Sequence, residues 1–195
     1  RVGLMGGYSR TTFDVKDRAA SGMSDNYHVG VYGGTQSGPL GLRLGATYTW
    51  HDITTNRSVI FPDFADHPRG DYQAGTTQAF GELGYGIRAG GLGFEPFVNA
   101  AYVNLHGDGF LEKGGAAALR GEGGATGVTF TTLGLHLSNE VMLGAVAVTA
   151  RATLGWRHAF GYAGPLATRA CGGGAPFTVA GVPIAQDAAV IDAGI

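Results

Sequence analysis

Between Leu40 and His51 the sequence LGLRLGATYTWH alternates without interruption between two kinds of residue. Every second position is apolar, and the positions between them carry glycine, arginine, threonine or histidine. Consecutive side chains of a β-strand point to opposite faces, so this segment is predicted to be a strand with one apolar and one polar face. The pattern leaves open whether the apolar face meets a protein interior or lipid.

The same alternation recurs along the chain, and no segment shows the period of a helix. It predicts an all-β protein whose antiparallel strands follow one another up and down. We expect about eight strands, in the segments Arg1–Phe13, Tyr27–Gly34, Leu40–His51, Thr77–Ile87, Leu92–Leu105, Val128–Ser138, Val146–His158 and Ala189–Ile195.

The connections between these segments alternate in length. Short glycine-rich turns join some neighbours, at 36–39 and 88–91, and long polar segments join the others, at 14–25, 53–71, 107–124 and 161–187. Short turns at one end and long loops at the other are typical of outer-membrane barrels. Within the second long segment, Phe61, Pro62 and Phe64 are predicted to pack the connector onto the barrel rim, with a surface contact as the alternative.

Strand length also favours a membrane. A strand of twelve residues, such as 40–51, is about 40 Å long at about 3.3 Å per residue. Tilted near 45°, it spans roughly 28 Å, which is close to the thickness of the hydrocarbon core of a bilayer. Strands of soluble proteins usually end after about five or six residues.

Composition points the same way. Charged residues make up 14% of the chain, well below the roughly 25% of soluble domains, so little charge is available to cover a water-facing surface. The net charge is −2 and no basic stripe is present, which argues against nucleic acid as a partner. No apolar run reaches about 18 residues, so no helical membrane span is predicted.

The two faces of the predicted strands differ in their chemistry. The polar face is expected to line the lumen of a barrel, with charged residues at Arg43, Glu82, Glu95, Arg151, Arg157 and Asp192. The apolar face is expected to meet lipid and to end in aromatic residues, which collect at membrane interfaces. These interface residues are Tyr8, Tyr48, Trp50, Tyr85, Tyr102 and Trp156.

Several strings resemble the C-terminal β-domain of bacterial autotransporters: TQAFGELGY (77–85), EPFVNAAYVNL (95–105), EKGGAAALRG (112–121), GWRHAFG (155–161) and PFTVAGVPIA (176–185). The resemblance implies a twelve-stranded barrel in the outer membrane of a Gram-negative bacterium. Such a barrel helps export a passenger domain by type V secretion and anchors it at the cell surface. The implied partners are outer-membrane lipid, the passenger, a linker helix in the lumen and the barrel-assembly machinery.

The resemblance also implies which part of the barrel is present. Family members continue beyond the strand matched here by IDAGI (191–195) and begin before the strand at Arg1. We therefore expect residues 1–195 to be one β-barrel domain that is incomplete at both ends and contains strands three to ten.

No pattern in the sequence indicates catalysis or a cofactor. The six histidines show no ligand spacing, Cys171 is the only cysteine, and there is no GxSxG motif. We therefore expect a protein without enzymatic activity, cofactor or metal. Some autotransporters cleave their own passenger with lumen residues, and Glu95 or Asp192 would be the candidates here.

Three alternatives stay open at this point. The charged residues of the polar face either grip a threaded segment or pair with one another across strands. The barrel is either a translocator or a porin or adhesin that binds through its long loops. A soluble β-sandwich would show the same alternation with its apolar face turned inward.

Overall fold

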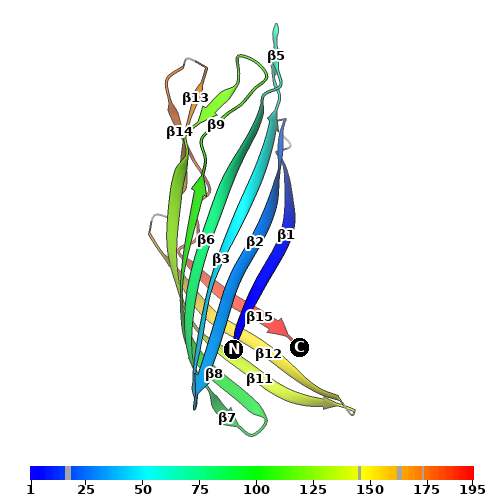
Figure 1. Ribbon diagram of the computed structural model, residues 1–195, viewed down its shortest axis with the longest axis vertical. Coiled ribbons are helices and arrows are strands. Elements are labelled where there is room, and N and C mark those ends of the chain that lie inside the picture. The colour runs from blue at the N-terminus through cyan, green and yellow to red at the C-terminus, as the bar shows by residue number, and fades with distance from the viewer. Residues whose placement is uncertain (16–18, 145, 162–163, 173) are drawn as a thin grey trace.

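The computed structural model describes residues 1–15, 19–144, 146–161, 164–172 and 174–195. Its main sheet contains eight long strands, each antiparallel to the next (Figure 1). They are β1 (Val2–Val15), β2 (Ala20–Ser37), β3 (Leu40–Arg57), β6 (Arg69–Tyr85), β8 (Leu92–Gly107), β11 (Gly124–Leu143), β12 (Val146–Phe160) and β15 (Asp187–Gly194). Their order in the sheet is their order in the chain, which confirms the predicted up-and-down antiparallel fold.

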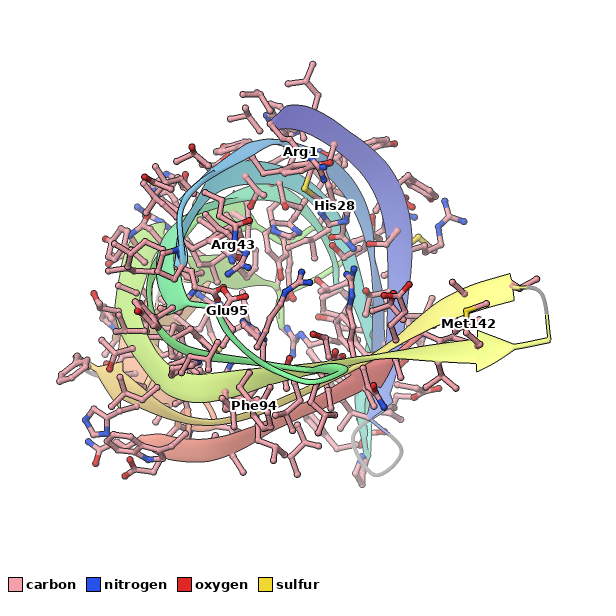
Figure 2. All side chains as sticks on the ribbon, turned by 90° about the horizontal axis from the view of Figure 1, so that it is seen from below. Arg1, His28, Arg43, Phe94, Glu95 and Met142 are labelled. Atoms are coloured by element: carbon pink, nitrogen blue, oxygen red, sulfur yellow. The ribbon has the colours of Figure 1, made fainter. Side chains whose placement is uncertain are left out.

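The sheet is curled around a hollow, with β1 and β15 as its two edges (Figure 2). Each interior strand is hydrogen-bonded to a neighbour on both sides, while β1 and β15 are not paired with each other. A short strand, β7 (Ile87–Ala89), pairs with the beginning of β8. Within the described ranges, no helix is long and apolar enough to cross a membrane.

The register of the strands aligns the sequence alternation across the whole sheet. Arg43 on β3 lies opposite Glu82 on β6, and Glu82 lies opposite Asn99 on β8. Polar positions of neighbouring strands therefore share one face, because a shift of one residue would move each side chain to the other face. This is the concave face, into which Arg43 and Glu95 point (Figure 2).

The convex face is apolar and exposed. Leu44 is 52% exposed and Trp156 is 50% exposed, whereas the described residues include only three buried hydrophobic side chains, Phe97, Val128 and Ala159. A soluble sandwich buries its apolar face against a second sheet. Within the described residues the main sheet has no such partner layer, so its apolar face is exposed, as in a barrel whose outer face meets lipid.

The strands are longer than the sequence pattern predicts. β2 and β3 each contain 18 residues, or about 60 Å of strand, which at a tilt of 45° spans about 42 Å and exceeds the hydrocarbon core of about 30 Å. The predicted loop 14–25 is wrong at both ends, because β1 continues to Val15 and β2 begins at Ala20. Residues 16–18 of that segment lie outside the described residues. Pairing with a neighbouring strand satisfies the backbone of polar segments that carry no alternating pattern.

The other three predicted loops also contain strands. In 53–71, β4 (Val59–Phe61) and β5 (Phe64–Asp66) form a hairpin. In 107–124 and 161–187, four short strands form a second sheet in the order β14–β13–β10–β9. These are β9 (Phe110–Leu111), β10 (Leu119–Gly121), β13 (Leu166–Cys171) and β14 (Phe177–Ala180). All of them lie at one end of the main sheet, and β7 lies at the other (Figure 1).

The turns at the β7 end are as short as predicted. Gly38 begins the turn between β2 and β3, and Gly90 begins the turn between β7 and β8. Their φ angles are 58° and 61°, a left-handed conformation that glycine adopts without a steric penalty. The sheet therefore has tight turns at one end and structured connectors at the other.

A buried ion pair ties the connectors to the end of β3. The Glu112 carboxylate is only 5% exposed and accepts hydrogen bonds from Arg57 Nε at 3.0 Å and from the Leu119 amide at 2.9 Å. Arg57 Nη2 binds the second carboxylate oxygen at 2.5 Å and also donates to the carbonyl of Ala117 at 3.1 Å. Burial favours the protonated acid, but these donors together hold the pKa of Glu112 below its ordinary value.

The direction of the apolar face can be tested with two lysine substitutions on β3. We expect Leu44→Lys to lower the free energy of unfolding in lipid vesicles by about 2–4 kcal/mol, because it places an ammonium group against the hydrocarbon core. Thr47→Lys, which faces the hollow, should have a much smaller effect. Denaturant unfolding of both variants measures the difference, and an equal or larger loss for Thr47→Lys would contradict the orientation.

The ion pair should make the connector order depend on pH. Because the folded pKa of Glu112 is depressed, its contribution is present above the ordinary pKa of about 4.5 and is lost as the pH falls through the lower folded value. Amide hydrogen exchange of Leu119 is therefore expected to accelerate in acid below that pH. In Glu112→Gln, exchange should already be faster at pH 7, by about tenfold, and should change little in acid. A wild-type profile that is flat in acid would count against this role.

Candidate functional site

The inner face of the sheet carries a charged cluster centred on Arg43. Its Nη1 donates to Oε1 of Glu95 at 2.6 Å and to Oε1 of Glu82 at 2.9 Å. The three side chains come from β3, β6 and β8, so the cluster joins three consecutive strands. The structure thus brings together three of the six charged residues that the sequence assigned to the polar face.

Two further side chains complete the environment of Glu82. His136 Nε2 on β11 lies 3.2 Å from its Oε1, and Asn99 Nδ2 donates to its Oε2 at 3.4 Å. The His136 ring is also stacked on Phe97, with centroids 4.0 Å apart, and its Nδ1 lies 2.9 Å from Thr153 Oγ1 on β12. The network therefore extends over five strands, and both ring nitrogens of His136 have a partner on the wall.

Glycine permits the close approach of Glu95 and Arg43. A Cβ placed on Gly84 would overlap the Glu95 carboxylate, and a Cβ on Gly41 would lie 3.7 Å from Oε1 of Glu95. The Glu95 side chain consequently lies flat over the backbone of the neighbouring strand. Larger residues at position 84 would push the carboxylate away from Arg43.

Arg151, Arg157 and Asp192 do not join this cluster. Arg151 lies opposite Ser138 and Gly194, and Asp192 lies opposite Thr153. Arg157 is placed over the ring of Phe130, with 5.2 Å from its Cζ to the ring centroid. Among the described residues, none of the three forms an ion pair within 4.0 Å.

Sequence reasoning missed a second network, formed by histidine, serine, threonine and asparagine side chains on β1, β2, β3 and β6. His28 bridges Ser9 Oγ at 3.0 Å and Thr49 Oγ1 at 2.9 Å. His51 similarly bridges Asn26 Oδ1 at 2.6 Å and Thr76 Oγ1 at 2.8 Å. The signal was present, because both histidines occupy polar positions of the alternation, but their partners depend on register.

The six aromatic residues assigned to the apolar face are all exposed, from 37% for Tyr48 to 54% for Tyr8. Tyr85 ends its strand as predicted, but the other five lie inside their strands; β3, for example, continues from Trp50 to Arg57. The exposed set is Tyr8, Tyr48, Trp50, Tyr85, Tyr102 and Trp156.

Beyond these aromatics the convex face becomes polar. Arg10 Nε donates to Asp25 Oδ1 at 2.6 Å, and Gln73 Nε2 donates to Asp52 Oδ1 at 2.8 Å. The Asp25 carboxylate also accepts a hydrogen bond from the Tyr8 hydroxyl, with 2.5 Å between the two oxygens. The convex face thus changes from aromatic to charged side chains along these strands.

No three histidine, cysteine or acidic side chains within the described ranges are arranged to bind a metal ion. Cys171 is a free, exposed thiol. Glu95, one candidate for cleavage of a passenger, is engaged by Arg43. The polar side chains of the concave face therefore form a wall of mutually bonded groups around Arg43.

Known proteins resemble this chain over its whole length. Residues 1–195 match the family described as autotransporter β-domain. Two extracellular serine proteases of Serratia marcescens are 40% and 38% identical to the chain over all of its residues. The chain spans 19% of the length of each of these relatives, so their name describes proteins of which the matched segment is a small part.

The fold has a solved counterpart. The translocator domain of the autotransporter NalP from Neisseria meningitidis matches 95% of this chain and 70% of its own, with a TM-score of 0.68 and 18% sequence identity. At that identity the likeness establishes the fold alone. Together with the family match over every residue, it shows that the chain belongs to the autotransporter β-domain family, the translocator barrels of the outer membrane of Gram-negative bacteria.

Proposed function

We propose that this β-domain provides a polar path through the outer membrane for the passenger linked to it, and then anchors that passenger at the cell surface. The single observation that carries the proposal is the opposition of the two faces of one curled sheet. The convex face exposes side chains such as Leu44 and Trp156, and the concave face carries the Arg43 cluster. The proposed role is mechanical and needs neither a cofactor nor catalysis by residues 1–195.

The sheet is proposed to be one arc of a larger barrel. β1 and β15 are edge strands that lack a second partner within the described residues. Unpaired peptide groups cost several kcal/mol each in hydrocarbon, so both edges must pair when the domain is in the membrane. Further strands of the same β-domain would satisfy them and would close the twelve-stranded barrel that the resemblance implies.

The inner wall is proposed to divide its charges between two roles. Arg43 forms ion pairs with both Glu82 and Glu95, so the role of these residues is to hold neighbouring strands together. Arg151, Arg157 and Asp192 have no such partner on the described wall, which leaves them available to a segment in the lumen. The linker helix of the passenger is the proposed occupant of the lumen, and charge-assisted hydrogen bonds would hold it there.

Two further partners follow from the outer surface. The aromatic residues at Tyr8, Tyr48, Trp50, Tyr85, Tyr102 and Trp156 are proposed to lie at the membrane interfaces. Insertion of a two-faced sheet into an existing bilayer exposes unpaired strands on the way. The cell's barrel-assembly machinery is therefore the proposed partner during insertion.

The proposal is tested with the full-length protein in its own outer membrane. Deletion of residues 1–195 is expected to leave the passenger in the periplasm, because the eight long strands of the proposed barrel wall are then missing. Accessibility of the passenger to an added protease in intact cells measures this. Folding of the intact β-domain is followed by its shift on an SDS gel between unboiled and boiled samples.

The control is a passenger carried by the intact domain, which should be digested from outside. A domain that folds and conducts ions while its passenger stays inside the cell would favour the porin alternative. Digestion of the passenger in intact cells without residues 1–195 would remove the need for this domain in export.

The structural role of the Arg43 cluster makes a separate prediction. Arg43→Ala leaves two carboxylates, 14% and 25% exposed, without their cation. We expect a loss of about 1 kcal/mol in unfolding free energy, a modest value because Arg43 itself is 45% exposed. Glu95→Ala and the double variant complete the cycle.

The double variant should lose less than the sum of the two single losses, because the two residues contact each other. Passenger display should persist in all three variants. Strictly additive losses would show that the ion pair contributes nothing, and a loss of display from a folded barrel would assign Arg43 to the occupant instead.

A further inference from the structure

The β4–β5 hairpin, residues 59–66, exposes large apolar side chains where lipid does not reach. On β3 the charged position Asp52 already lies beyond the aromatic level of Trp50. The strand then continues to Arg57 before the hairpin begins. In Figure 1 the hairpin is the part of the molecule farthest from β7. Its surroundings are therefore water and whatever protein lies outside the membrane.

The tip of this hairpin is aromatic and ordered. Phe61 and Phe64 are stacked, with ring centroids 4.6 Å apart and planes 10° from parallel. Ile60 is 69% exposed and Phe61 is 56% exposed, so the prediction that this segment packs onto the rim is wrong. Asp63 adopts a φ of 63° to close the turn between the two rings, an uncommon conformation for a residue other than glycine.

The base of the hairpin is fixed to the rest of the domain. Pro68 is fully buried, and its carbonyl accepts a hydrogen bond from the Arg57 amide at 2.9 Å. Asp66 Oδ2 accepts the Ala117 amide of the neighbouring connector at 2.7 Å. The Ser58 amide donates to Ala19 at 2.9 Å. These bonds hold the tip away from the rim and prevent it from covering its own apolar surface.

We propose that the tip, formed by Ile60, Phe61 and Phe64, binds an apolar surface of the passenger linked to the same chain. Exposed apolar patches on an ordered element mark sites of protein contact. Stacked aromatic rings are suited to this role, because they bring large contact area with little side-chain entropy to lose.

The choice of partner rests on proximity, and it rests on the proposed function. The matched segment is 19% of the length of the Serratia relatives, so most of such a protein lies outside the β-domain. A passenger anchored at the barrel is present near the mouth at an effective concentration of about a millimolar, as for other short tethers. The part of the passenger nearest to the barrel is therefore the surface that the tip meets first.

Site-specific photocrosslinking in intact cells tests the contact. A benzophenone amino acid replaces Phe61 in the full-length protein, and in a control it replaces Glu122, an exposed residue of another connector. We expect a crosslink within one polypeptide between position 61 and the passenger, identified by mass spectrometry, and a much weaker one at position 122. A crosslink from position 61 to a second copy or to lipid alone would overturn the proposal.

A pair of variants provides the second measurement. Phe61→Ser with Phe64→Ser should leave the heat-dependent gel shift and the display of the passenger unchanged. Proteolysis of the passenger near its junction with the barrel should become about tenfold faster, because the docked segment opens more often. Leu111→Ser, which removes an apolar residue that is 65% exposed elsewhere in the connectors, is the matched control and should have no such effect.

The outcomes separate this proposal from the translocator role. A displayed passenger with no crosslink at position 61 and unchanged proteolysis would overturn the docking and leave the translocator role intact. A folded barrel whose passenger stays in the periplasm would overturn both.

Discussion

Peptide groups in a hydrocarbon layer find hydrogen-bond partners only on the protein itself, and this requirement shapes the rest of the molecule. It is met here by eight long antiparallel strands, each paired in register with the next. Such pairing keeps successive side chains on opposite faces of the sheet over the full length of a strand. A sheet with one polar and one lipid-facing side needs no hydrophobic core. Few hydrophobic side chains of the described part are therefore buried, namely Phe97, Val128 and Ala159.

The inner wall follows from the same pairing. Register places Arg43 beside Glu82 and brings His136 opposite Glu95, so polar side chains that are distant in sequence meet on one wall. Small residues make these contacts possible. Gly84 leaves room for the Glu95 carboxylate, and the ring of Phe80 similarly occupies the space where a side chain at Gly45 would lie. Glycine-rich strands thus provide recesses into which the side chains of the next strand fit.

Much of this could be predicted from alternation alone. The number of long strands, the polar side of Arg43 and the turns at Gly38 and Gly90 all follow from local sequence. The ends of the strands do not, because polar segments such as 53–57 pair with a neighbour without any period of their own. The network of His28 and His51 was equally out of reach, since it depends on which residues face each other across strands. The connector strands β9 and β13 carry no alternation long enough to identify them.

The connectors lie in a different solvent from the strands of the main sheet. Beyond the lipid, an exposed apolar side chain is in contact with water, which is unfavourable, and a buried charge needs a partner. Glu112 meets this condition through Arg57 and the Leu119 amide. Phe61 does not meet it within the domain, since the hydrogen bonds at Pro68 and Asp66 hold it outward. The same fixed base that orders the connector therefore leaves the aromatic tip exposed, and the proposed docking to the linked passenger would cover it.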